Sequence, residues 1–439
     1  PVTKVGDPVG LTLDRRFGLY RGPQLLTSGA IGLTGAATAA TYSTTTGAGT
    51  VTRVDASNQS WVQFSGLTVG RSYQITVSGV SGGTLQVRDG SATGTVIAST
   101  TSGTPCLVTA TGTTITLTAS AAATVAFTVT QIQWLPGNHR IQATSGSRKT
   151  LSARVNMLLA TATMATQNVT TVATSYKLSF TGTGTVTLTG TSTAGPLVGT
   201  GANDRVSLTF TPTAGTLTLT VSGSVTLADL RTADDAAKNI PAYQRVNTAS
   251  DYDTDGFPFF WLFDGTDDSD ATASTVDGSA SDKVTVIAGV TKLSDAADGT
   301  IVAFGDPSAS NAGSFVMQAP GSSAVTKIQF ASRGASAQAV PFTVSATYSA
   351  PISLVATAQA DIAAPVASLR LNAVAVSTLT TTQGTGNYGT WTGSWGRRIG
   401  GFAPFNGREY AYIERFGPMS DSERNQAERW VARQMGVTI

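Results

Sequence analysis

Residues 176–230 decide the fold, because YKLSF (176–180), RVSLTF (205–210) and TLTLTVSGSVTLADL (216–230) alternate apolar and mostly hydroxyl-bearing side chains. Successive side chains of a β-strand point to opposite faces, so this period of two places Leu, Val and Phe inward and Thr and Ser outward. The sequence PTAG (212–215) stands where a hairpin turn is needed. The stretch therefore predicts antiparallel strands with one buried face.

The same pattern extends along most of the chain. SYQITVSGV (72–80) and TVAFTVTQIQW (124–134) alternate in the same way, and Gly and Ser separate such runs at spacings near ten residues. These features predict an all-β protein built from antiparallel sandwiches. The predicted order is an N-terminal arm (1–25), a small jelly-roll-like β-sandwich (26–135), a linker (136–155), a second small sandwich (156–236) and a larger C-terminal sandwich (237–439).

One helix is expected, at the end of the chain. Ser420 followed three residues later by Glu423 forms a capping box, and Gly436 supplies a C-terminal stop. The spacing predicts a helix over 421–435 whose apolar stripe packs against the last sandwich.

Composition excludes several classes of function. Charged residues make up 12% of the 439 residues, the formal net charge is +2, and no block of Lys and Arg is present. We therefore expect no nucleic-acid binding. No apolar run approaches the length of a membrane span, so no membrane insertion is expected. A single Cys and a single His exclude disulfide frameworks and Cys/His zinc sites, and His139 falls in the linker, where a structural role is expected.

Catalysis is not expected either. A glycosidase of this fold class generally needs two carboxylates that flank the scissile bond. All four Glu residues lie near the C-terminus, from Glu409 onward, and Glu423 and Glu428 fall on the predicted helix. We predict that the chain is not an enzyme, with a polysaccharide depolymerase as the less favoured alternative.

A calcium site is the only cofactor site that the sequence suggests. DYDTDG (251–256) repeats the start of an EF-hand loop, which makes Asp251, Asp253 and Asp255 candidate ligands. The twelfth position is Leu262 instead of the bidentate Glu, so turns held by local hydrogen bonds are the competing interpretation. A second acidic set could serve instead and comprises Asp264, Asp267, Asp268 and Asp270.

Aromatic residues in a Gly-rich segment give a candidate glycan site. Tyr388, Trp391 and Trp395 lie in GTGNYGTWTGSWGRR (384–398), a segment of loop composition. Exposed rings can stack on sugars, and planar guanidinium groups suit acidic sugars. Packing against the sandwich edge or a subunit is the alternative. The Arg donors at this site would be Arg397 and Arg398. Four other tryptophans follow strand or helix patterns and are expected in the core: Trp61, Trp134, Trp261 and Trp430.

Several spaced motifs resemble a known family. Residues 240–439 resemble the C-terminal laminin-G-like (concanavalin A-like) domain of bacteriophage tail and virion proteins, and 26–135, through WVQFSGLTVGRSYQITVSG (61–79), resembles a carbohydrate-binding module. The C-terminal motifs are IPAYQRV (240–246), FWLFDGTDD (260–268), DKVTVIAGVTKLSDA (282–296), SLRLNAVAV (368–376), GRRIGGFAPFNGREYAYI (396–413) and MSDSERNQAERWVARQMG (419–436).

The resemblance implies a structural protein of a phage virion, in a tail or fibre-like appendage, whose lectin-like modules adsorb to glycans of the host surface. Its expected partners are other virion proteins, further copies of the chain and bacterial surface polysaccharide. For the copies of the chain, a trimer is the best single expectation. A virion scaffold that binds no sugar is the alternative, because these folds serve both roles.

Overall fold

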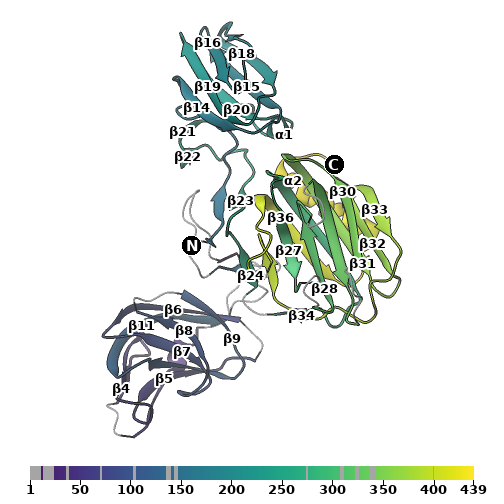
Figure 1. Ribbon diagram of the computed structural model, residues 1–439. Coiled ribbons are helices and arrows are strands. Elements are labelled where there is room, and N and C mark those ends of the chain that lie inside the picture. Colours follow the sequence, from purple (N-terminus) through teal and green to yellow (C-terminus); the bar gives the residue numbers. More distant parts are fainter. Residues whose placement is uncertain are drawn as a thin grey trace. The chain divides into compact units, whose positions relative to one another are not determined.

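The computed structural model describes residues 11–12, 24–35, 39–69, 72–101, 105–134, 140–142, 147–272, 275–306, 311–321, 326–336, 342–398 and 400–439. Most of the predicted arm (1–25) and His139 lie outside these residues. The described part is almost entirely antiparallel β-structure with one long helix, which confirms the predicted fold class (Figure 1). Among the described residues, no helix has the length and apolar character needed to cross a membrane.

The N-terminal sandwich consists of two five-stranded sheets that enclose one core. Inward residues such as Phe64 of β5 and Ile75 of β6 are fully buried, as the alternation predicts. One sheet has the order β2 (Ala30–Leu33), β5 (Ser60–Ser65), β10 (Thr114–Ala119), β7 (Leu85–Asp89) and β8 (Val96–Thr100). The other has the order β3 (Thr41–Tyr42), β4 (Ala48–Arg53), β11 (Ala123–Trp134), β6 (Ser72–Ser81) and β9 (Pro105–Thr109). The 3-10 turn η2 (Leu26–Ser28) precedes β2, and β1 (Leu11–Thr12) pairs with β12 (Arg140–Ile141).

The C-terminal sandwich packs a seven-stranded sheet against a second large sheet around a core rich in Phe. The first has the order β13 (Thr150–Ser152), β23 (Phe260–Asp264), β36 (Asn406–Phe416), β26 (Lys283–Lys292), β31 (Ile352–Asp361), β32 (Val366–Leu371) and β33 (Val374–Leu379). The second contains, in order, β24 (Asp270–Thr272), β35 (Gly393–Trp395), β27 (Thr300–Phe304), β28 (Ser314–Gln318), β29 (Lys327–Arg333) and β30 (Phe342–Thr347). A short pair joins β25 (Val276–Asp277) and β34 (Thr390–Trp391).

Helix α2 (Asp421–Met435) covers the outer face of the seven-stranded sheet. Its capping box is formed as predicted: the Ser420 side chain accepts from the Glu423 N–H, and the Glu423 carboxylate accepts from the Ser420 N–H. Gly436 ends the helix in the left-handed conformation. A Cβ at Gly289 of β26 would lie 2.7 Å from Val431, so this glycine permits the close approach of the helix.

The middle sandwich is an insertion into the C-terminal sandwich. Strand β13 pairs with β23, with Thr150 opposite Leu262, so the chain leaves this sheet after Ser152 and returns to it at Phe260. The predicted linker (136–155) therefore contains a strand of the seven-stranded sheet. The inserted sandwich has two sheets, one of β14 (Gln167–Thr171), β19 (Gly215–Ser222), β16 (Thr185–Gly190) and β17 (Leu197–Val198), and one of β18 (Gly201–Phe210), β15 (Tyr176–Gly182) and β20 (Val225–Thr232).

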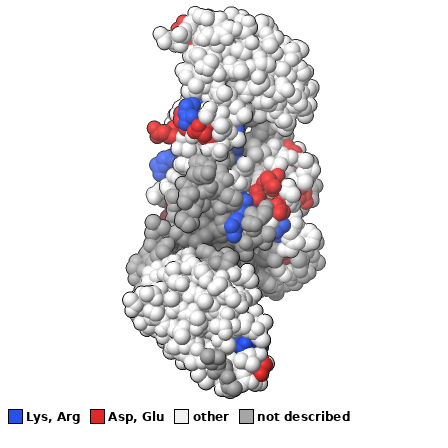
Figure 2. Space-filling view, turned by 90° about the vertical axis from the view of Figure 1, so that its left-hand side faces the viewer, with Lys and Arg blue, Asp and Glu red and all other residues white. Residues whose placement is uncertain are grey.

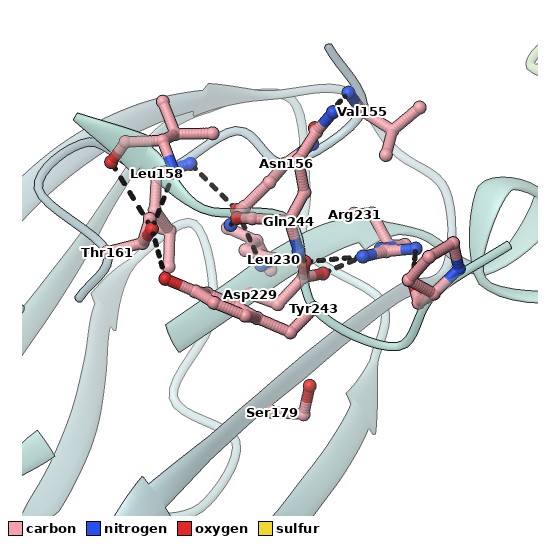
Figure 3. Close-up of polar contacts among 12 residues, drawn as sticks. Val155, Asn156, Leu158, Thr161, Ser179, Asp229, Leu230, Arg231, Tyr243 and Gln244 are labelled. Atoms are coloured by element: carbon pink, nitrogen blue, oxygen red, sulfur yellow. Dashed lines mark hydrogen bonds and ion pairs between the residues drawn. The ribbon is translucent and has the colours of Figure 1, made fainter. Parts of the chain in front are cut away.

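A buried polar network ties together the two chain segments that connect this insertion (Figure 3). The Gln244 Oε1 accepts from the N–H groups of Val155 and Asn156, at 2.8 and 3.0 Å. The Asn156 Nδ2 donates to the carbonyls of Ala228 and Gln244, both at 2.9 Å. Because Asn156 and Gln244 are fully buried, each of these bonds replaces one that water would otherwise supply.

A short helix and a short hairpin follow the last strand of the inserted sandwich. Helix α1 (Ala233–Ala236) begins after Thr232, whose side chain accepts from the Asp235 N–H, and the strands β21 (Val246–Thr248) and β22 (Asp251–Tyr252) form a hairpin. The Asp235 carboxylate is buried and accepts from Arg408 of β36 at 2.8 Å and from Lys238 at 2.6 Å. Burial of a carboxylate together with two cations keeps its charge compensated.

Candidate functional site

Two of the three aromatic residues predicted to contact glycan are part of the core. Tyr388 is 2% exposed, and its hydroxyl hydrogen-bonds to the Ser332 hydroxyl at 2.8 Å. Trp395 of β35 is 4% exposed and packs edge-on against Tyr412 at a centroid distance of 5.3 Å. Rings whose faces are covered cannot stack on a sugar, so the expected exposed loop platform is absent at these two positions.

The other members of the predicted set are half-buried and already engaged. The Trp391 Nε1 donates to the Ala312 carbonyl at 3.0 Å. The Arg397 Nε donates to the Ser269 hydroxyl at 3.0 Å, and the Arg398 guanidinium donates to the Gln318 Oε1 at 3.0 Å. These contacts fix the segment to neighbouring loops and strands, which corresponds to the packing alternative. The sequence pattern did not distinguish this alternative from sugar binding.

The first acidic set predicted for calcium does not converge on a common point. The carboxylates of Asp251 and Asp253 form ion pairs with Arg245, at 3.2 and 3.0 Å. Asp255 is exposed and is not grouped with them. The Asp ligands expected from the DYDTDG motif are therefore replaced by a surface ion-pair cluster around one arginine.

The second acidic set does converge. Carboxylate oxygens of Asp264, Asp267 and Asp268 lie within 4.8 Å of one another, in the turn after β23. Burial, together with the charges of Asp264 and Asp267, raises the pKa of the Asp268 carboxyl to about 6. Such hard oxygen donors are the type that Ca²⁺ prefers, so these three residues are the ones that could hold it. Asp270, the fourth residue of this predicted set, is not part of the group, because its buried carboxylate forms an ion pair with Lys149.

A different face, on the N-terminal sandwich, carries partly exposed aromatic and polar side chains that the sequence interpretation did not consider as a site. In β5, Val62 and Phe64 point into the core, so Trp61 and Gln63 point outward from the sheet. Both are partly exposed, and within the described residues no group hydrogen-bonds to the Trp61 Nε1 or the Gln63 Oε1. The expectation of a buried Trp61 was therefore wrong, although the alternation in SWVQFS (60–65) already indicated an outward position.

Neighbouring strands fix these two side chains in place. A Cβ at Gly32 of β2 would lie 2.4 Å from the Trp61 ring, so the indole packs directly over this glycine. The Gln63 Nε2 donates to the Gly90 carbonyl at 3.0 Å and to the Thr116 hydroxyl at 3.2 Å. An aromatic ring and an amide are thus held side by side on a rigid sheet.

Two strands further along the same face, Arg88 of β7 continues the polar surface. Its Nε donates to the Thr118 hydroxyl at 3.1 Å, and its Nη2 donates to the Gln86 Oε1 at 2.7 Å. Thr118 is opposite Gln86 in register, and Thr116 of the same strand is opposite both Arg88 and Gln63. We name this surface, formed by Trp61, Gln63, Gln86, Arg88 and Thr118, the polar sheet face.

Comparisons with known proteins give only remote structural likenesses. No protein-family model and no curated protein matches the chain. The CBM40 of the Ruminococcus gnavus IT-sialidase bound to α2,3-sialyllactose matches with 16% identity and a TM-score of 0.28, over 34% of this chain and 83% of that chain.

Two further solved structures are similarly distant. A heptameric SAP-like pentraxin from Limulus polyphemus matches with 12% identity and a TM-score of 0.30, over 39% of this chain and 80% of that chain. The botulinum neurotoxin serotype G binding domain matches with 11% identity and a TM-score of 0.30, over 43% of this chain and 46% of that chain. Similarity at this level assigns neither a family nor a ligand.

Proposed function

We propose that this chain is a non-enzymatic structural protein of a bacteriophage particle, in a tail or fibre-like appendage, that adsorbs to host-surface glycans through the polar sheet face. One observation carries the glycan part: Trp61 and Gln63 stand side by side on a rigid sheet with an indole N–H and an amide oxygen unused. Sugars present apolar C–H faces and hydroxyl groups, and these are the groups that an aromatic ring and an amide recognise.

The particle assignment rests on the sequence motifs of residues 240–439, which resemble phage virion proteins. In that setting the working state would be a homo-oligomer, with a trimer preferred, in contact with other virion proteins. Oligomerisation suits a weak glycan site, because several copies that bind one polysaccharide raise the overall affinity without any new contact. A mass measurement of the purified chain at high concentration tests this part, and a species that stays monomeric would contradict it.

A virion scaffold that binds no sugar is the second candidate. The burial of Tyr388 and Trp395 favours it for the C-terminal sandwich, because the loop that was expected to bind sugar contributes to the core instead. The two candidates differ in where they place function: on the polar sheet face, or only on surfaces between proteins.

The deciding experiment is a glycan array with the full chain and two variants. Trp61→Ala removes the stacking surface, and we expect binding to fall at least tenfold, which corresponds to about 1.4 kcal/mol. Phe402→Ala is the matched control, because Phe402 is an aromatic residue with 67% exposure on the C-terminal sandwich. Loss of binding in both variants, or in neither, would contradict the assignment to the polar sheet face. Release of reducing ends would show a depolymerase instead.

A further inference from the structure

We propose that the glycan recognised at the polar sheet face is anionic, and that Arg88, assisted by Arg53, receives its carboxylate or sulfate group. This inference rests on the proposed glycan-binding function and specifies the class of its ligand. It depends on the charge balance of the N-terminal sandwich and on the donors that the Arg88 guanidinium still has free.

The N-terminal sandwich contains very little charge. The charged residues described between 24 and 134 are Arg53, Asp55, Arg88 and Asp89. In Figure 2, the surface of the N-terminal sandwich on the side that faces the viewer is almost free of Lys, Arg, Asp and Glu. Arg53 and Arg88 are therefore the only cations that the described part of this sandwich offers to an anionic ligand.

Arg88 has only neutral partners. Besides Thr118 and Gln86, its Nη1 donates to the Gly94 carbonyl at 2.8 Å. A guanidinium offers five N–H donors, so these three bonds leave two for a ligand. Arg88 forms no ion pair with any described residue. Burial, together with the charge of Arg53, lowers the pKa of its guanidinium. A partly buried cation with free donors is the usual complement of a planar anion.

Neither described carboxylate of this sandwich forms an ion pair with Arg88, although Asp89 follows it in the chain and its Oδ1 has no hydrogen-bond partner among the described residues. The Asp55 carboxylate accepts from the N–H groups of Ser57 and Asn58 in its own turn, at 2.7 and 2.8 Å. The Asp89 carboxylate accepts from the Thr111 hydroxyl. Arg53 itself donates to the carbonyls of Asp55 and Ser120. The charge of Arg53 contributes to the lowered pKa of the Arg88 guanidinium, so the two cations repel each other and a bound anion would relieve that repulsion.

The geometry fits one short oligosaccharide. Strands β5 and β7 are separated only by β10, and Gln63 and Arg88 are both opposite Thr116, so these two residues lie about 10 Å apart, two strand spacings. Trp61 is two residues away from Gln63 along β5. Thr118 of β10, the strand between β5 and β7, is fully buried, so the surface between the two strands is covered by side chains. A sugar stacked on Trp61 can therefore extend an acidic neighbour toward Arg88.

A purely structural role for Arg88 is the competing explanation, because its bond to Gly94 also fixes the β7–β8 turn. The protein uses guanidinium groups in this way elsewhere: Arg154 donates to the carbonyls of Asn156, Met157 and Leu158. The two explanations differ in charge selectivity. A structural arginine would not make the protein prefer anionic over neutral glycans.

The test uses pairs of probes that differ only in charge. Oligogalacturonate and its methyl ester form the carboxylate pair, and dextran sulfate and dextran form the sulfate pair. We expect the wild-type chain to bind one charged member at least tenfold more tightly than its neutral counterpart, with an affinity that falls as salt rises. The pair that shows the preference identifies the anionic group.

Three variants locate the preference. Arg88→Gln should abolish it, whereas Arg53→Gln, which leaves the three Arg88 hydrogen bonds intact, should reduce it a few-fold. Arg205→Gln is the matched control, because Arg205 on the inserted sandwich also donates to neutral groups, Ser179 and Leu227. Thermal unfolding verifies that each variant is folded.

Equal binding of charged and neutral probes, or a preference that survives in Arg88→Gln, would overturn the inference. The proposed function would then still stand if binding of a neutral glycan depended on Trp61. It would fail separately if Trp61→Ala had no effect on any glycan.

Discussion

Replacing Asn156 by Ala tests whether the buried network holds the inserted sandwich in place. Asn156 is fully buried, and its side chain makes four hydrogen bonds. Its Nδ2 donates to two carbonyls at 2.9 Å, and its Oδ1 accepts from the N–H groups of Leu158 and Leu230, at 3.2 and 3.0 Å. The Ala variant leaves two carbonyls and two N–H groups without partners. Each buried unsatisfied group costs about 1–3 kcal/mol, and water entering the space would offset part, so we expect a loss of about 4 kcal/mol.

Hydrogen–deuterium exchange is the appropriate assay, because a chain of several sandwiches does not unfold in one two-state step. The measurement follows peptides that cover β20, where Leu230 donates to Asn156. A loss of about 4 kcal/mol corresponds to roughly a thousandfold faster exchange through local opening. Asn168→Ala is the matched control, since Asn168 lies exposed on β14 of the same sandwich. Exchange in β20 that accelerates less than about fivefold would refute the reasoning.

Two further predictions concern the acidic turn and the polar sheet face. Burial and two neighbouring carboxylates raise the pKa of Asp268 to about 6 from an ordinary 3.8. The folded state therefore binds the proton more tightly than the unfolded state does, and the free energy of unfolding falls as pH rises from about 4 to 6. Asp268→Asn should remove this pH dependence. Because solvent screens the site, the variant should gain only on the order of 1 kcal/mol in free energy of unfolding at pH 8, as followed by thermal melts. An unchanged pH profile would contradict this prediction. Gly32→Val should displace the Trp61 ring and weaken glycan binding as strongly as Trp61→Ala, with little change in melting temperature, and retained binding would show that the ring position is unimportant.

The sequence predicted the strands and the last helix because both have local signals. Alternation with a period of two identifies which side chains face inward, and Leu178 and Phe180 are indeed fully buried. The capping box at Ser420 likewise depends only on residues three positions apart. Local chemistry was sufficient for these elements.

The insertion and the burial of the Gly-rich segment depend on contacts between distant residues, and no local pattern contained them. Strand β13 has three residues, too few for alternation to be visible, and its partner lies about a hundred residues further on. Trp391 and Trp395 occupy very short strands that pair with Val276 and Val302. Glycine-rich composition predicted an exposed loop there, but the glycines accompany strands packed close to neighbouring backbone.

The two outward faces of the N-terminal sandwich provide an internal comparison for the proposed function. Both arise from the same alternation, and β-propensity alone explains the threonines on either face. On the face of β4 and β11 hydroxyl groups bond to one another, as in Thr52 with Thr124 at 3.0 Å and Thr41 with Thr50 at 2.8 Å. The face of β5 and β7 instead carries an indole and a guanidinium with donors to spare. Neither is needed for strand formation, and an unpaired cation is costly on a half-buried surface. An indole and a guanidinium with donors to spare, held on the same rigid sheet, are therefore the observation on which the proposed ligand site rests.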